Sequence, residues 1–165
     1  MTDPRMPVII GAGQATWRKT PAPGPRAMIR EAVAHAAANA GVPLAALSAA
    51  DTVGVVGFTI DAPGTAARMK PPRMSDPPAA LAEDLGASPR TAIYTHMGGN
   101  SPQALVNWAS ERIANGESDL VVLAGAEFLG SLMKTMMSGG DVSIFKWLLR
   151  HDPVAVSGSR CRSTS

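Results

Sequence analysis

The stretch "SPQALVNWASERIANGESDLVVLAG", from Ser101 to Gly125, decides the fold. Its first part places apolar residues at helical spacing, with Ser101 suited to cap the helix, Pro102 suited to its first position and Gly116 suited to end it. The continuous apolar run over 120–125 then predicts a strand buried on both faces. A helix that leads into such a strand is typical of a parallel α/β sheet.

The chain before this stretch repeats the same alternation. Short apolar, β-branched runs predict strands, and runs of helical periodicity that stop at glycine predict helices. The predicted strands cover 8–10, 51–60 and 90–96, and the predicted helices cover 28–40 and 78–86. The order therefore predicts an α/β fold with a mainly parallel sheet, helices on both faces and right-handed crossovers.

The alternation stops after Gly130. Residues 133–165 hold one apolar patch, 144–149, and then a Ser/Arg-rich end of low complexity. We therefore expect a domain over 1–132 and an irregular tail over 133–165, with 153–165 disordered.

Composition and charge exclude several classes of protein. Residues 1–133 carry ten Lys/Arg and eleven Asp/Glu, so the net charge of +2 comes from the tail and no basic face indicates nucleic-acid binding. No apolar run is long enough for a membrane helix, and Cys161, the single cysteine, fits a reducing compartment. We expect a cytoplasmic protein without a metal site, since three scattered histidines and one cysteine supply no ligand set.

The opening "VIIGAGQAT", from Val8 to Thr16, raises the alternative of nucleotide binding. An apolar run followed by Gly11-x-Gly13 looks like the start of a dinucleotide-binding fingerprint, but position 16, where the third glycine belongs, holds a threonine. Pro21, Pro23 and Pro25 then interrupt the expected helix, so this alternative stays weak.

Five segments together resemble the N-terminal half of thiolase-family proteins, in particular acetyl-CoA acetyltransferases and sterol-carrier-type thiolases. They are "VIIGAGQ", "EAVAHAAANAGV", "LAEDLG", "ALVNWASERIANGESD" and "LAGAE", and the resemblance covers about residues 6–130. It implies one half of the thiolase fold, and a parent reaction of acyl transfer with a CoA thioester as substrate and no cofactor.

The resemblance also implies a nucleophilic cysteine between the third strand and the following helix. Aligned on the shared segments, that position falls at Gly98 or Gly99, and neither glycine can attack a thioester. The histidine and second cysteine of the family's second half have no counterpart, and Cys161 in the tail cannot substitute. We therefore expect a truncated chain without catalytic residues that is inactive alone. The sequence alone does not decide whether this chain is an enzyme.

The turn before the helix is the candidate substrate-binding site, formed by His96, Gly98, Gly99, Asn100 and Ser101. Ser101 could also act as a replacement nucleophile with His96 as its base, although its role as a helix cap is favoured.

The alternative function is a non-catalytic thiolase-like subunit that binds acyl-CoA or a complementing chain. We expect a homo-oligomer or a partner chain that supplies the second half. In the family the third strand, here Ala92 to Thr95, pairs across a dimer interface, and the helix that follows is sandwiched between sheets. Leu105 and Trp108 would then lack their natural cover and form apolar surface.

Overall fold

A parallel sheet of three strands organises the chain. The computed structural model describes residues 5–18, 22–61 and 76–140. Its elements are α1 (Pro25–Asn39), η1 (Leu44–Ala49), β1 (Thr52–Val55), η2 (Thr59–Asp61), α3 (Pro77–Leu85), β2 (Thr91–Tyr94), α4 (Ser101–Ala114), β3 (Val121–Ala124) and α5 (Leu129–Met137).

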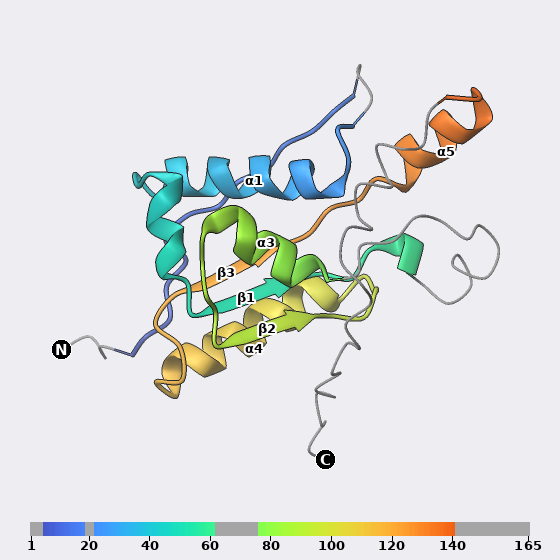
Figure 1. Cartoon of the computed structure of the whole chain (residues 1–165). Helices are drawn as coiled ribbons and strands as arrows, with labels where there is room; N and C mark the ends of the chain where they lie inside the picture. Colours follow the sequence, from blue (N-terminus) through green and yellow to red (C-terminus); the bar gives the residue numbers. More distant parts are fainter. Residues whose placement is uncertain (1–4, 19–21, 62–75, 141–165) are drawn as a thin grey trace, which may run out of the picture.

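The strand order is β2-β1-β3, and both pairs are parallel. In register, Thr52 of β1 lies opposite Thr91 of β2 and Val121 of β3. Helices α1 and α3 cover one face of the sheet and α4 covers the other (Figure 1). The predicted α/β class, with a parallel sheet and helices on both faces, is confirmed.

The most buried strand is β1 rather than β3. All four residues of β1 are buried, whereas in β3 only Val122 is. The apolar run at 120–125 was expected to be buried on both faces, and this was wrong, since only Val122 of β3 is buried. Among the described residues β3 is an edge strand, with β1 beside it and no strand beyond it. The central place belongs to β1, and Gly54 lets side chains from β2, β3 and α4 approach it closely.

The helices of the first face follow their sequence signals. In α1 the buried residues Ile29, Val33 and Ala37 recur every four positions, and Gly41 follows the helix with a φ of +74°. In α3, Asp76 caps the helix by accepting from the Ala79 N–H at 3.0 Å.

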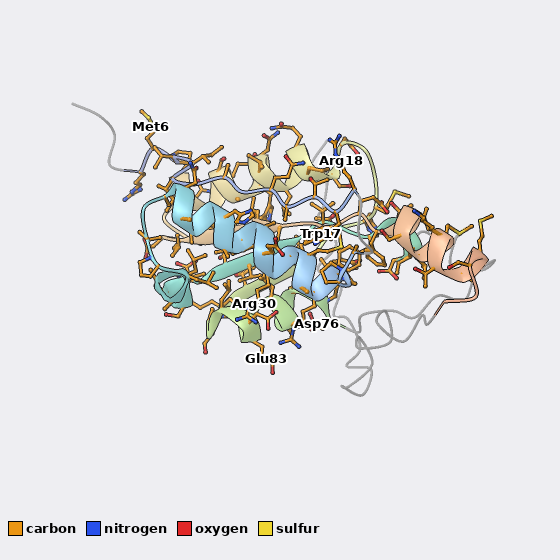
Figure 2. The ribbon with its side chains drawn as sticks, turned by 90° about the horizontal axis from the view of Figure 1, so that it is seen from above. Met6, Trp17, Arg18, Arg30, Asp76 and Glu83 are labelled. Carbon is orange, nitrogen blue, oxygen red and sulfur yellow. The ribbon has the colours of Figure 1, made fainter. Side chains whose placement is uncertain are left out.

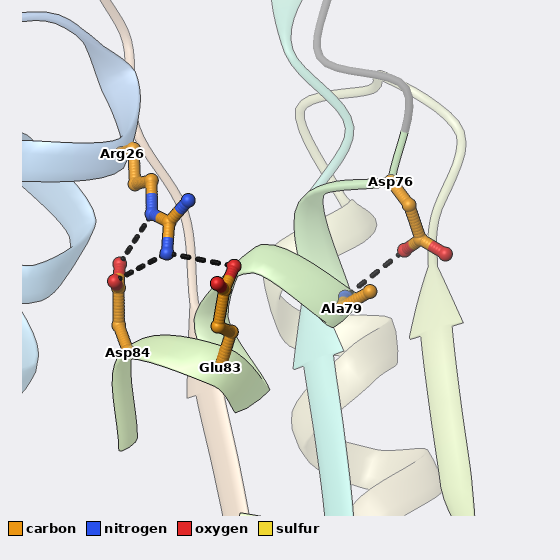
Figure 3. Close-up of polar contacts among 5 residues, drawn as sticks. All are labelled: Arg26, Asp76, Ala79, Glu83 and Asp84. Carbon is orange, nitrogen blue, oxygen red and sulfur yellow. Dashed lines mark hydrogen bonds and ion pairs between the residues drawn. The ribbon is translucent and has the colours of Figure 1, made fainter. Parts of the chain in front are cut away.

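Arg26 joins α1 to α3 (Figure 3). Its guanidinium donates to both carboxylate oxygens of Asp84, at 2.9 and 2.6 Å, and to Glu83 at 3.0 Å. The hydrogen bonds from Arg26 to Asp84 raise the pKa of the guanidinium. The forked geometry fixes the relative position of the two helices.

The predicted first strand at 8–10 is not a strand in the structure. Val8, Ile9 and Ile10 are 66%, 81% and 59% exposed, and 5–18 runs along α1 instead of entering the sheet (Figure 2). A β-branched run needs a neighbouring strand to form a ladder, and no described segment supplies one.

The two glycines of the opening motif serve contact with α1. A Cβ at Gly11 would lie 2.3 Å from the Ala36 carbonyl oxygen, and one at Gly13 would lie 2.2 Å from the Ala32 carbonyl oxygen. The Ala12 N–H also donates to Asn39 Oδ1 at 3.0 Å. The Gly-x-Gly motif is therefore explained by close backbone packing, which any other side chain would block.

Helix α5 extends beyond the point where irregular structure was expected. Residues 133–137 are helical, and Leu132 within the same helix is 1% exposed. The apolar patch at 144–149 and the stretch 153–165, for which disorder was predicted, lie outside the described residues. None of the helices in the described ranges is long and apolar enough to cross a membrane.

A polar cluster around Asp51 closes the amino ends of the strands. Asp51 accepts from the Ser118 hydroxyl and from the Asp119 N–H, the latter at 2.7 Å. Burial raises the pKa of Asp51, but the hydrogen bonds from Ser118 and Asp119 outweigh it and lower the pKa to about 2. This cluster fixes β1 against the turn that leads into β3.

Candidate functional site

The carboxyl ends of β1, β2 and β3 meet at one edge of the sheet. In parallel α/β sheets this edge is the usual place for ligands, because the loops that leave the strands converge there. Here the loops cover 56–61, 95–100 and 125–128. The candidate residues from His96 to Asn100 belong to the second of them, and Ser101 begins α4 directly after it.

Tyr94, the last residue of β2, connects the end of that strand to the first of these loops. Its hydroxyl accepts from the Phe58 N–H at 2.8 Å and donates to Asp61 Oδ2 at 2.7 Å. The ring of Phe58 packs edge-on against Tyr94 and Phe128, with centroid distances of 5.7 and 5.5 Å. The aromatic cluster thus packs the end of β2 against the first and third loops.

Glu127 connects the third loop to the first. Its carboxylate accepts from the Thr59 hydroxyl and from the Leu129 N–H, the second bond being 2.7 Å long. The short helix η2 is therefore held from both sides, by Tyr94 through Asp61 and by Glu127 through Thr59.

Gly57 places the first loop directly against the candidate turn. A Cβ there would lie 2.4 Å from the Thr95 carbonyl oxygen and 2.7 Å from the Met97 nitrogen. The Gly57 N–H also donates to Thr95 Oγ1 at 3.1 Å. The path of the turn after β2 is thus set by the loop that follows β1, through a contact that only glycine allows.

Ser101 does not cap α4, contrary to the sequence-based expectation. It is the first residue of the helix, Asn100 occupies the cap position without a side-chain hydrogen bond, and Pro102 follows one place later than predicted. The Ser101 hydroxyl donates to the His96 backbone carbonyl at 2.7 Å, which folds the turn back on itself. Its proton is thus directed at a carbonyl oxygen rather than at the His96 imidazole, and His96 is exposed.

The turn presents a row of backbone donors. The Ser101 N–H bonds to the Gly98 carbonyl at 3.0 Å, whereas the N–H groups of Gly98, Gly99 and Asn100 have no acceptor among the described residues. Gly99 is exposed, and nothing lies within 4 Å of a Cβ built on it. Successive free N–H groups before a helix N-terminus are suited to a carbonyl oxygen or an anion.

Leu105 is covered, which corrects the expectation that α4 leaves it exposed. It is 3% exposed, and Gly54 of β1 allows it to reach the sheet. Trp108 is half-buried, with the Arg112 guanidinium 5.0 Å from the ring centroid. The outward face of α4 is largely polar, with Gln103, Asn107 and Glu111 exposed. The exposed large apolar side chains lie instead at residues 6–10, at Met97 in the turn and on α5.

The described ranges hold no group of three metal-ligating side chains, and Cys161 lies outside them. Sequence reasoning found the turn but missed the residues that support it, namely Thr59, Asp61, Tyr94 and Gly57. The available signal was a carboxylate shortly after two of the predicted strands, Asp61 after the run at 51–60 and Glu127 after the run at 120–125, because strand ends of a parallel sheet share one edge.

The described residues form a parallel α/β layer with a glycine turn before helix α4. Among solved structures, this chain is similar to a monomeric SCP2-thiolase-like protein type 1 from Mycobacterium smegmatis, with 31% sequence identity and a TM-score of 0.59. The match covers 76% of this chain and 24% of the other. The fold is therefore thiolase-like, and the chain spans about a quarter of that neighbour's length.

No protein-family model and no curated protein matches the sequence.

Proposed function

We propose that the chain is the first part of a thiolase-like acyl-CoA acyltransferase, that its β2–α4 turn binds the thioester of an acyl-CoA, and that it forms no acyl-enzyme by itself. The observation that carries this proposal is the row of free N–H groups at Gly98, Gly99 and Asn100. Donors of this kind can form hydrogen bonds to the carbonyl oxygen of a thioester.

The absence of covalent chemistry rests on the residues at the turn. Glycine stands at both candidate positions for the family's cysteine, and the Ser101 hydroxyl is bonded to a carbonyl rather than to a base. A serine nucleophile needs a group that accepts its proton, and a backbone carbonyl cannot do so.

Intact-mass measurement after incubation with acetyl-CoA tests this proposal. We expect no added acetyl group on the natural chain. In a Cys161→Ser background, Gly99→Cys should gain one, because the added side chain has open space and the N-terminus of α4 lowers a thiol pKa. Met137→Cys, an exposed site far along the chain on α5, serves as the matched control. An acetyl group on natural Ser101 would refute the proposal.

A second candidate function is a non-catalytic subunit that pairs with a complementing chain. The exposed apolar residues at 6–10 favour it, since contiguous surface of this kind marks interaction sites. Co-expression with the remaining part of a thiolase-like protein would distinguish the two functions: a stable complex without acyl transfer supports the subunit, whereas acyl transfer by the complex supports the enzyme part.

A further inference from the structure

The segment from Met6 to Ile10 is apolar on all sides and exposed. Val8, Ile9 and Ile10 are consecutive, so in a stretched chain they point in different directions, and yet each is more than half exposed. Within the described residues, no hydrogen bond involves positions 6–10. The segment thus offers both its side chains and its backbone to a partner.

The position of this segment is fixed by the residues that follow it. Gly11 and Gly13 press against the backbone of α1, Ala12 donates to Asn39, and the His35 ring bonds the Gln14 carbonyl at 2.8 Å. The apolar residues therefore extend from an anchored stretch, which lowers the entropy lost when a second strand pairs with them.

We propose that residues 7–11 pair, as antiparallel strands, with the same segment of a second copy of this chain. The surface is self-complementary when the pairing is centred on Ile9, because Val8 of each copy then faces Ile10 of the other and exchanges both backbone hydrogen bonds with it. Pro7, which has no N–H, falls opposite Gly11 at a position whose N–H points away from the partner.

Charge placement favours an antiparallel over a parallel pairing of the two copies. Residues 6–17 carry no Asp, Glu, Lys or Arg, so no charged side chain lies within the paired segment 7–11. The antiparallel register places Arg5 of each copy near Gly13 of the other, whereas a parallel register would place the two Arg5 side chains together. Like charges directly opposite one another destabilise strand pairs.

Sedimentation velocity and hydrogen exchange test the proposal on the full chain. We expect a concentration-dependent dimer in which the amides of Val8 and Ile10 become protected while that of Ile9 does not. Ile9→Lys should raise the dimer dissociation constant at least about tenfold, with helix content unchanged. Met137→Lys, which adds the same charge at a residue 83% exposed, should leave the dissociation constant unchanged.

Four results would overturn the proposal: a chain that stays monomeric, a dimer equally sensitive to both lysines, protection of Ile9 in place of its neighbours, or dissociation by Ala92→Lys on the edge of β2 but not by Ile9→Lys. The acyl-CoA site does not enter any of these measurements, so failure here leaves the proposed function untouched.

Discussion

Gly57→Ala should destabilise the chain and disturb the candidate turn at the same time. The added Cβ would lie 2.4 Å from the Thr95 oxygen, 2.7 Å from the Met97 nitrogen and 2.8 Å from the His96 carbonyl carbon. Non-bonded heavy atoms lie about 3.5 Å apart at their optimal separation, so the backbone of the turn must move by roughly 1 Å to accept the added Cβ. All three obstacles are backbone atoms, which cannot rotate aside as a side chain could.

Overpacking of this kind costs about 1–3 kcal/mol, and we expect the upper end because three backbone contacts are violated. Urea unfolding followed by circular dichroism measures the loss. Gly99→Ala is the matched control, since nothing lies within 4 Å of its Cβ, and it should change the free energy of unfolding by less than about 0.5 kcal/mol. Equal free energies of unfolding for natural and Gly57→Ala chains would refute the description of this contact.

Three further predictions concern the support of the fold. Tyr94→Phe removes the hydroxyl that bonds Asp61 and should cost about 1–3 kcal/mol in urea unfolding and speed amide exchange in η2. Asp51 has a lowered pKa, so its contribution of about 2 kcal/mol is present above pH 4 and is lost as the pH falls toward 2; Asp51→Asn should flatten this part of the acid unfolding curve. Arg26→Met keeps most of the aliphatic part of the side chain but removes the two hydrogen bonds to the Asp84 carboxylate, so it should lower the melting temperature. An unchanged melting temperature would show that this link between α1 and α3 is dispensable.

The sequence predicted the elements whose signals are local. Helix α1 ends before Gly41 and α3 before Gly86, as their left-handed glycines require, and the strands at 52–55, 91–94 and 121–124 lie inside the predicted runs.

It failed where the outcome depends on neighbours that are distant in sequence. Val8 to Ile10 have strand-forming side chains but no described strand beside them, and their exposure follows from that absence. Leu105 was expected to lose its cover, whereas Gly54, some fifty residues earlier, lets it reach the sheet. The hydroxyl of Ser101 was expected to cap a helix, whereas the folded turn brings the His96 carbonyl within its reach.

A titration of isotope-labelled chain with acetyl-CoA, followed by amide nuclear magnetic resonance, tests the central claim most directly. If the β2–α4 turn binds the thioester, the amide signals of Gly98, Gly99 and Asn100 shift together and saturably, while those of Gly41 and Gly116, which lie after the far ends of α1 and α4, stay in place. Coenzyme A without its acyl group should shift the three turn amides less, because it lacks the thioester oxygen. Unmoved turn signals at saturating acetyl-CoA would contradict the account.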